Sequence, residues 1–143
     1  MVYRNSGDEL EVFLVHPGGP FYSKKDDGVW SIPKGLFEAD EDPLSAARRE
    51  FEEETGQKIA GDFFKLKPIT QKRGKIVIAW AVEAEVDAEN IVSNTFELEW
   101  PPKSGKMQEF PEVDRGEWFD VDTAKRKINP AQAALVDELV ERV

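Results

Sequence analysis

The sequence contains no cysteine and only one histidine, His16. The absence of cysteine excludes disulfide bonds, thiolate zinc sites and cysteine nucleophiles, and it is typical of a reducing compartment. A single histidine excludes a metal site built from several histidines, and we expect His16 to be a polar residue at the end of a strand rather than part of a Ser-His-Asp relay. We therefore expect a cytoplasmic protein whose chemistry uses neither thiols nor a histidine relay.

Long apolar segments and an excess of positive charge are also missing. The longest apolar run, Ile76 to Val82, is much shorter than the roughly 20 residues that span a membrane, and the N-terminus lacks a signal-peptide pattern. Lysine and arginine number 19 against 29 aspartate and glutamate, which gives a formal net charge of −10. This balance disfavours stable binding to nucleic acid or to anionic membranes. An acidic protein that acts on a phosphate compound must bring cations, which points to a bound metal ion.

The 143 residues, of which 40% are hydrophobic, can form one compact core but are too few for two ordinary domains. We therefore expect a single domain over residues 1–143. The alternation of apolar and polar residues predicts strands at 1–4, 10–15, 63–69, 75–86, around 95–100 and at 117–121, and helices at 43–55 and 130–143. The first two strands should form a hairpin, and the last helix should carry one apolar stripe, which comprises Leu135, Val136, Leu139, Val140 and Val143.

Residues 43–55 are the most clearly predicted helix. Asp42 can cap its start, Pro43 suits its first position and Gly56 can end it. Apolar residues recur at helical spacing and predict the face that packs on the core, which consists of Leu44, Ala47 and Phe51.

A second face of this helix is acidic. Glu50, Glu53 and Glu54 stand at positions i, i+3 and i+4 and therefore share it, whereas Glu52 points away and should be ordinary surface. Repulsion at this spacing costs roughly 0.2 to 0.5 kcal/mol per pair, and a divalent cation would reverse it. Carboxylate oxygens select Mg²⁺ or Mn²⁺. Taken alone, the same residues fit a solvated acidic helix equally well.

The residues around this helix resemble the Nudix box. Five residues separate Gly35 from Glu41, and seven separate Glu41 from Arg49. The remaining fixed positions of the box are filled by Glu50, Glu53, Glu54 and Gly56. The last position departs from the pattern, because Gln57 replaces an apolar residue there, and we expect Ile59 to take over its packing. Agreement at this many spaced positions favours the family over a solvated acidic helix.

The resemblance implies the Nudix fold, an α/β architecture in which a mixed β-sheet is sandwiched between α-helices. It also implies a hydrolase in which a water molecule, activated by Mg²⁺, attacks a phosphorus atom of a phosphate anhydride. The small-molecule substrate would be a nucleotide or polyphosphate linked through a nucleoside diphosphate.

Site roles follow from the same resemblance. Glu50, Glu53 and Glu54 would hold the metal ion, while Arg49 and Glu41 would fix the carboxylates through ion pairs. Family enzymes recruit a further carboxylate from a later loop as metal ligand or general base.

This chain offers four acidic residues in the region of that later loop, namely Glu97, Glu99, Glu109 and Glu112. Glu112 is the first choice, because the stretch from Glu112 to Trp118 resembles the loop before the late strand of MutT-like enzymes. Glu109 is the second choice. A solvated loop acid is the competing interpretation for either residue.

The segment from Trp30 to Gly35 resembles the Trp-x-apolar-Pro-Lys-Gly segment of Nudix enzymes that act on dinucleoside polyphosphates or diphosphoinositol polyphosphates. It implies that Trp30, Lys34 and Gly35 bind substrate, with Lys34 at a phosphate. The alternative is a core tryptophan and a solvated lysine. The same two interpretations apply to the cations Lys24, Lys25, Arg73, Lys75, Lys103 and Lys106, and the aromatic residues Phe21, Tyr22 and Trp100 can stack on a base or cover the core.

The sequence therefore predicts a Mg²⁺-dependent Nudix hydrolase, with a dinucleoside polyphosphate as the first substrate candidate. ADP-ribose and nucleoside triphosphates are alternatives, because specificity lies in loops outside the box. A Nudix domain that senses a nucleotide without cutting it is the rival class, and the intact Arg-Glu and Glu-Glu pairs argue against it. Isoprenoid diphosphate isomerisation on this fold is disfavoured because those enzymes use a cysteine.

Overall fold

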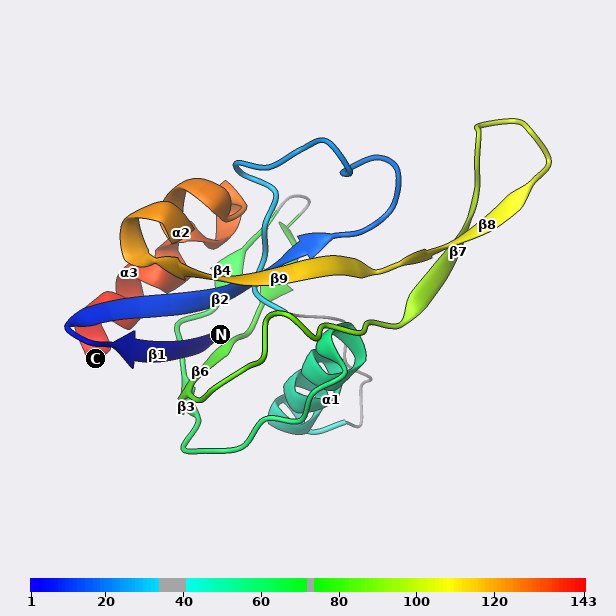
Figure 1. Cartoon of the computed structure of the whole chain (residues 1–143). Helices are drawn as coiled ribbons and strands as arrows, with labels where there is room; N and C mark the ends of the chain where they lie inside the picture. The colour runs from blue at the N-terminus through cyan, green and yellow to red at the C-terminus, as the bar shows by residue number, and fades with distance from the viewer. Residues whose placement is uncertain (34–40, 72–73) are drawn as a thin grey trace.

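A five-stranded sheet forms the centre of the molecule, in a computed structural model that describes residues 1–33, 41–71 and 74–143. Its strand order is β3-β6-β1-β2-β9 (Figure 1). The strands are β1 (Val2–Ser6), β2 (Glu9–Pro17), β3 (Phe64–Lys65), β6 (Trp80–Glu83) and β9 (Val113–Asp120). β1 runs parallel to β6 and all other neighbours are antiparallel, so the sheet is mixed, as predicted.

Two smaller sheets flank this centre. β4 (Ile69–Thr70) and β5 (Ile76–Val77) form a short hairpin, and β7 (Thr95–Glu99) pairs with β8 (Met107–Pro111). Figure 1 shows that the β7–β8 hairpin projects away from the body of the molecule, where it continues the direction of β9.

Helices cover both faces of the central sheet. α1 (Pro43–Thr55) lies on one face, and α2 (Val121–Lys127), the 3-10 helix η2 (Pro130–Gln132) and α3 (Ala133–Arg142) belong to the other (Figure 1). Within the described ranges, no helix is long and apolar enough to cross a membrane.

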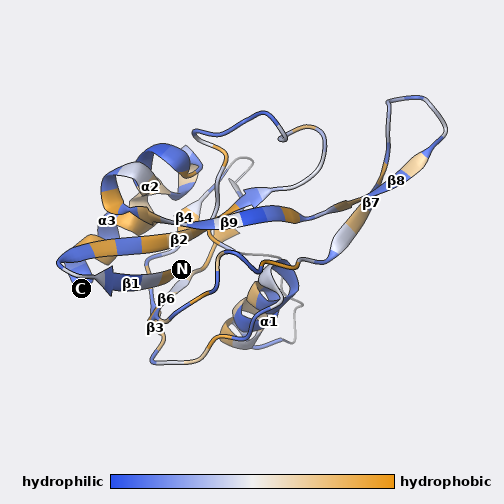
Figure 2. Cartoon of the chain, in the orientation of Figure 1, coloured by the Kyte–Doolittle hydropathy of each residue, from blue (hydrophilic) through white to orange (hydrophobic). Residues whose placement is uncertain are grey.

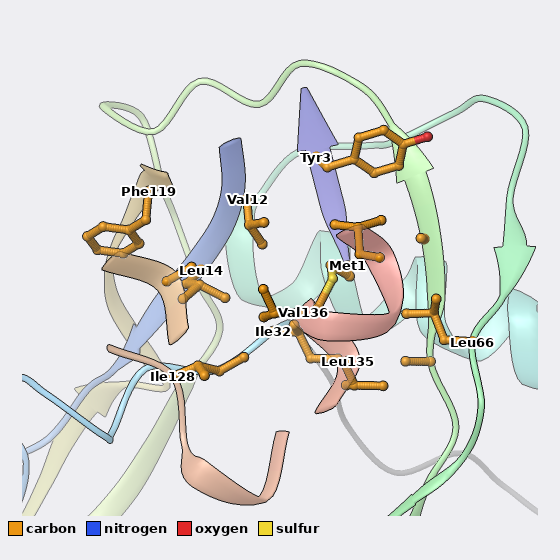
Figure 3. Close-up of a cluster of buried hydrophobic side chains, with 14 of the residues drawn as sticks. Met1, Tyr3, Val12, Leu14, Ile32, Leu66, Phe119, Ile128, Leu135 and Val136 are labelled. Carbon is orange, nitrogen blue, oxygen red and sulfur yellow. The ribbon is translucent and has the colours of Figure 1, made fainter. Parts of the chain in front are cut away.

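The two faces of β2 explain this sandwich. Val12 and Leu14 belong to the core cluster under α2 and α3, while Phe13 and Val15 belong to the cluster under α1. Successive side chains of a strand point to opposite faces, so a strand buried on both sides needs a continuous apolar run. Figure 2 shows that run along β2, and Figure 3 shows Val12 and Leu14 in the first cluster with Val136 of α3. The predicted α/β/α architecture is confirmed.

The predicted helix at 43–55 is confirmed to the residue. The Asp42 carboxylate accepts a hydrogen bond from the Ser45 backbone N–H at 3.0 Å, which caps the helix. Gly56 ends it in the left-handed region with φ 76°. A Cβ at Gly56 would lie 2.8 Å from the Val92 carbonyl oxygen, so this end of the helix requires glycine. The first hairpin is also confirmed.

Several predicted boundaries are wrong. The expected strand 63–69 divides into β3 and β4, because Pro68 lies between them and has no N–H for a strand ladder. The expected strand 75–86 divides into β5 and β6, which pair with different sheets. The late strand begins at Val113 rather than residue 117, since it pairs with β2 over its whole length.

The C-terminal region also differs from the prediction. The chain forms α2 after β9, which has no counterpart among the predicted helices, and the last helix begins only at Ala133, after the 3-10 turn. Leu135, Val136 and Leu139 are buried as expected. Val140 and Val143 of the predicted apolar stripe are instead 44% and 52% exposed, because they lie beyond the part of α3 that faces the core.

Candidate active site

Helix α1 presents its carboxylates around one guanidinium, that of Arg49. Arg49 donates two hydrogen bonds to Glu41, Nε to Oε2 and Nη2 to Oε1, both at 2.9 Å. Its Nη1 donates to Glu50 at 3.0 Å and to Glu53 at 3.1 Å. The planar fork of arginine suits such two-bond pairing, and it holds the acidic side chains in defined positions.

The pKa values of Arg49 and Glu50 reflect how closely these charged side chains are packed. Hydrogen bonds to Glu41 and Glu53 raise the pKa of Arg49, so the guanidinium stays charged. Burial, followed by repulsion from the Glu53 charge, raises the pKa of Glu50 despite the nearby guanidinium. The negative charge on this helix face is therefore only partly balanced by Arg49.

A cleft of about 730 Å³ lies beside the C-terminal end of α1. Glu54 of α1 and Glu112, which directly precedes β9, both line it. The other lining residues come from the β2 end, the loop that follows it, the β4–β5 turn and the η2 region, and they are Val15, Pro17, Tyr22, Gly28, Val29, Ser31, Gln71, Lys75, Val113, Asn129, Pro130, Ala131 and Gln132.

Backbone hydrogen bonds explain why Glu112 lies near α1. The Asn94 N–H donates to the Glu53 carbonyl at 2.7 Å, and the Asn94 carbonyl accepts from the Glu112 N–H at 2.9 Å. The Gly18 N–H donates to the Glu112 carbonyl at 2.9 Å. A Cβ on Gly18 would lie 1.9 Å from the Pro111 carbonyl oxygen, so only glycine permits this approach. These contacts fix residue 112 against both α1 and the end of β2.

The donor chemistry fits a hard divalent cation, although the four predicted ligands are divided between two places. Glu50 and Glu53 contact Arg49, whereas Glu54 and Glu112 line the cleft. In the parts of the chain that the structure describes, no three acidic or histidine side chains are close enough together to hold a metal ion. Carboxylate oxygens are the ligands that Mg²⁺ and Mn²⁺ prefer, so Glu50, Glu53, Glu54 and Glu112 are the residues that could hold such an ion.

Trp30 lies in the core rather than in the cleft. Its side chain is 1% exposed, its Nε1 donates to Asp26 at 2.8 Å, and its ring contacts Phe119 edge to face. The burial argues against the expected direct contact with substrate and favours the core interpretation. Lys34 and Gly35 lie outside the described residues, as does Arg73.

The other residues predicted to bind substrate or metal lie partly in the cleft and partly elsewhere. Lys75 and Tyr22 line the cleft, whereas Lys24, Lys25, Lys103 and Lys106 are exposed elsewhere. Phe21 contacts Trp100 at 5.3 Å between ring centroids, and Glu97, Glu99 and Glu109 lie on the projecting β7–β8 hairpin and not in the cleft. Glu112 is therefore the late acidic residue that the structure brings to the cleft.

His16 is a polar residue near the end of β2, as expected, but it is also fully buried. Its Nδ1 lies 2.8 Å from Asp114 Oδ1, and its Nε2 lies 2.7 Å from the Lys25 carbonyl oxygen. It therefore fastens the loop after β2 to β9 at one side of the cleft.

Sequence reasoning missed the polar residues Gln71, Asn129 and Gln132, which line the same cleft as Glu54. The helix predicted at 130–143 places Gln132 in its first turn, where a polar residue needs no special explanation. The Asn129-Pro130 pair, an N-cap signal, is the one indication in the sequence that this turn is distinct.

Comparisons with known proteins identify the family to which this chain is related. The family model of the NUDIX domain matches residues 1–139. A curated octanoyltransferase of Myxococcus xanthus is 29% identical over 127 residues, and the match covers 89% of this chain but only 31% of that protein. That relative is thus much longer than the matching segment.

Two solved structures share the fold. An Ap4A hydrolase of C. elegans has a TM-score of 0.62 and 18% identity, with 98% of this chain and 92% of that chain covered. The NUDIX domain of NrtR from Shewanella oneidensis, complexed with ADP ribose, has a TM-score of 0.64 and 16% identity, with 99% and 82% covered. The match of the NUDIX family model over nearly the whole chain shows that this protein belongs to the Nudix family, and the architecture agrees with that assignment.

Proposed function

We propose that this protein hydrolyses a phosphate anhydride in a small molecule linked through a nucleoside diphosphate, with bound Mg²⁺, or Mn²⁺ in its place, and with a dinucleoside polyphosphate as the first substrate candidate. The observation that carries the proposal is that Glu54 of α1 and Glu112 before β9 line one cleft, next to the carboxylates that Arg49 arranges.

The proposed roles divide among these residues. Glu50, Glu53, Glu54 and Glu112 would hold the cation, which when bound supplies positive charge for the phosphates and a lower pKa for water. Arg49 keeps Glu50 and Glu53 oriented and is itself held by Glu41.

The reaction forms a bond between a water oxygen and a phosphorus atom and breaks the bond from that phosphorus to the bridging oxygen. The bridging oxygen leaves with the second phosphate group, and a proton of the water passes to a carboxylate. Glu54 and Glu112 are the candidates for that acceptor, because both face the cleft in which the anhydride would lie.

The cleft supports a nucleotide-sized substrate. Its volume of about 730 Å³ lies within the range of roughly 300 to 1,000 Å³ that is usual for small-molecule sites. The relatives of similar fold include a hydrolase of Ap4A and a domain that binds ADP ribose, so both compounds are suitable first probes.

A substrate panel tests the proposal. We would incubate the protein with Mg²⁺ and, separately, a dinucleoside polyphosphate, ADP-ribose, nucleoside triphosphates, a diphosphoinositol polyphosphate and capped RNA, and resolve the products by chromatography. We expect anhydride cleavage of at least one compound that stops in excess chelator and returns with Mg²⁺ or Mn²⁺. Full turnover in chelator would refute the metal-dependent mechanism.

The rival function is nucleotide sensing without cleavage. It is supported by the structure of similar fold in which the NUDIX domain of NrtR is complexed with ADP ribose. Tight binding of ADP-ribose by calorimetry, with no cleavage of any panel compound in Mg²⁺ or Mn²⁺, would establish sensing instead of hydrolysis.

A further inference from the structure

The lining of the cleft contains a chain of hydrogen bonds that begins at a backbone amide. The Ile32 N–H donates to Oε1 of Gln132 at 3.1 Å. The Gln132 side chain is 0% exposed. A backbone N–H can only donate, so the Gln132 atom that faces Ile32 must be the oxygen, and the orientation of this buried amide is fixed.

The amino group of Gln132 then has two defined acceptors. Its Nε2 donates to Ser31 Oγ at 3.2 Å and to Gln71 Oε1 at 3.4 Å. The Ser31 hydroxyl gives its own proton to the Ile32 carbonyl at 2.7 Å, so it can only accept from Gln132. Both hydrogens of the Gln132 amino group are therefore engaged, one by Ser31 and one by Gln71.

This chain determines how Gln71 faces the cleft. Its Oε1 is occupied by Gln132, so its Nε2 is the amide atom that remains for other partners. Gln71 is half-buried and lines the cleft, and in the described residues no acceptor for its Nε2 is within hydrogen-bond distance. The cleft thus presents an oriented, uncharged donor that cannot turn into an acceptor without breaking the contact with Gln132.

The cleft that this donor faces also has lining that suits a nucleobase. Gln71 is paired across the β4–β5 turn with Lys75, which is the only cation among the described residues that line the cleft. Apolar or aromatic lining comes from Val29, Pro130, Ala131 and Tyr22, which is 40% exposed. Asn129 is a further neutral polar residue of the lining, and its Oδ1 already accepts from the Ala131 N–H at 3.0 Å. Apolar and aromatic surfaces with a few neutral polar groups fit a base, whereas the acidic lining residues are Glu54 of α1 and Glu112, which is tied to α1 through Asn94.

We propose that Gln71 is a specificity-determining residue that donates a hydrogen bond from Nε2 to the carbonyl oxygen of a 6-oxopurine base, with Gln132 as its positioning residue. The proposal rests on the proposed function, since it assigns the base of that substrate. A 6-oxopurine presents an acceptor at position 6, whereas a 6-aminopurine presents a donor there, which would oppose the Gln71 amino group. The protein therefore prefers inosine or guanosine nucleotides over adenosine nucleotides.

Matched inosine and adenosine substrates test this preference, because their bases differ only along the N1–C6 edge. With the anhydride that the panel identifies, we expect kcat/KM to be about tenfold higher for the inosine compound. Gln71→Leu should raise KM for the inosine compound, leave kcat little changed, and bring the ratio close to one. Gln71→Glu keeps an acceptor for Gln132 but turns a second acceptor to the cleft, so the preference should reverse toward adenosine.

The control is Gln108→Leu, which alters a glutamine on the projecting hairpin outside the cleft and should keep the wild-type ratio. Equal kcat/KM for both wild-type substrates, or an inosine preference that survives both Gln71 variants, would overturn the assignment while leaving the hydrolase function intact.

Binding measurements distinguish a failure of the base assignment from a failure of the proposed hydrolase function. Calorimetry with the α,β-methylene analogues of IDP and ADP, which cannot be hydrolysed at the bridge, measures the preference without turnover. If the panel shows no hydrolysis but the IDP analogue binds about tenfold tighter and Gln71→Leu removes the difference, the proposed activity fails and the base assignment stands. If neither analogue binds, or both bind equally, the base assignment is wrong.

Discussion

Arg49 and Glu41 form a two-bond ion pair, with both N–O distances at 2.9 Å. Glu41 precedes α1 and Arg49 lies within it, so the pair ties the approach to the helix to its acidic face. The third guanidinium nitrogen reaches Glu50 and Glu53. One arginine therefore sets the positions of three carboxylates that the sequence motif placed at fixed spacing.

The substitution Arg49→Lys should lower kcat/KM by about 10- to 100-fold, as is usual when a residue that orients metal ligands is changed. A lysine keeps the charge but cannot contact Glu41 with two nitrogens and still reach Glu50. Steady-state kinetics with the best panel substrate measure the effect. Arg48→Lys is the matched control, because Arg48 is exposed and packs over Phe63 instead. Equal activity of both variants would contradict the orienting role.

Glu112→Gln should lower kcat by roughly two orders of magnitude or more, since an amide is a poor metal ligand and a poor proton acceptor. The neighbouring Glu109→Gln should be nearly silent, because Glu109 lies on the exposed hairpin outside the cleft. Kinetic assays of the two variants show which glutamate supplies the late carboxylate. A larger loss at Glu109 than at Glu112 would show that the hairpin, and not the cleft, supplies the late carboxylate.

Lys34 lies outside the described residues, and its role remains a prediction from the sequence. If it contacts a phosphate beyond the scissile bond, Lys34→Ala should raise KM for a dinucleoside polyphosphate by about tenfold or more, which corresponds to a charge-assisted contact. ADP-ribose, a more compact substrate, should be affected much less. The same KM change for both substrates, or no change, would remove this reason for favouring dinucleoside polyphosphates.

Asp120 caps α2, and its contribution to stability should depend on pH. The backbone N–H of Thr123 and then the Thr123 hydroxyl donate to its carboxylate, at 2.8 and 3.0 Å, and lower its pKa. A carboxyl whose pKa is lowered on folding stabilises the protein above its unfolded pKa, and that stabilisation is lost as the pH falls through the folded pKa.

Asp120→Asn should therefore lower the melting temperature at pH 6, and the difference from the wild type should shrink as the pH approaches 3. Asparagine keeps a capping oxygen, so the variant removes the charge and not the cap. Glu141→Gln, which removes the same charge from an exposed position on α3, is the control. A difference that grows toward low pH would contradict the assigned direction of the pKa change.

Local signals in the sequence predicted the part of the site that lies on one helix. The cap at Asp42, the stop at Gly56 and the carboxylate spacing within 43–55 involve residues close together in the chain, so they could be inferred without tertiary structure. The same holds for the first hairpin, where a short turn joins two apolar segments.

The remaining features depend on contacts between distant segments. Asn94 bridges the end of α1 to Glu112, and Gln132 is fixed by Ile32, and no periodicity in the sequence records either contact. The division of 75–86 into two strands has a similar cause, since β5 and β6 pair with different partners. Helix α2 has a capping aspartate and a basic last turn, but its seven residues carry too little apolar pattern to be predicted.

The most direct test of the proposed metal-dependent mechanism is a Mg²⁺ titration of kcat/KM for Glu53→Gln, Glu54→Gln and Glu52→Gln beside the wild type. We expect all three variants to fold, because each amide keeps the shape of the side chain it replaces. Glu53→Gln and Glu54→Gln should lose activity by a few orders of magnitude, and Mg²⁺ should restore little of it, because a neutral amide binds the cation weakly. Glu52→Gln should match the wild type. A loss at Glu52 as large as at Glu53, or full activity of the Glu53 and Glu54 variants, would contradict the assignment of catalysis to this helix face.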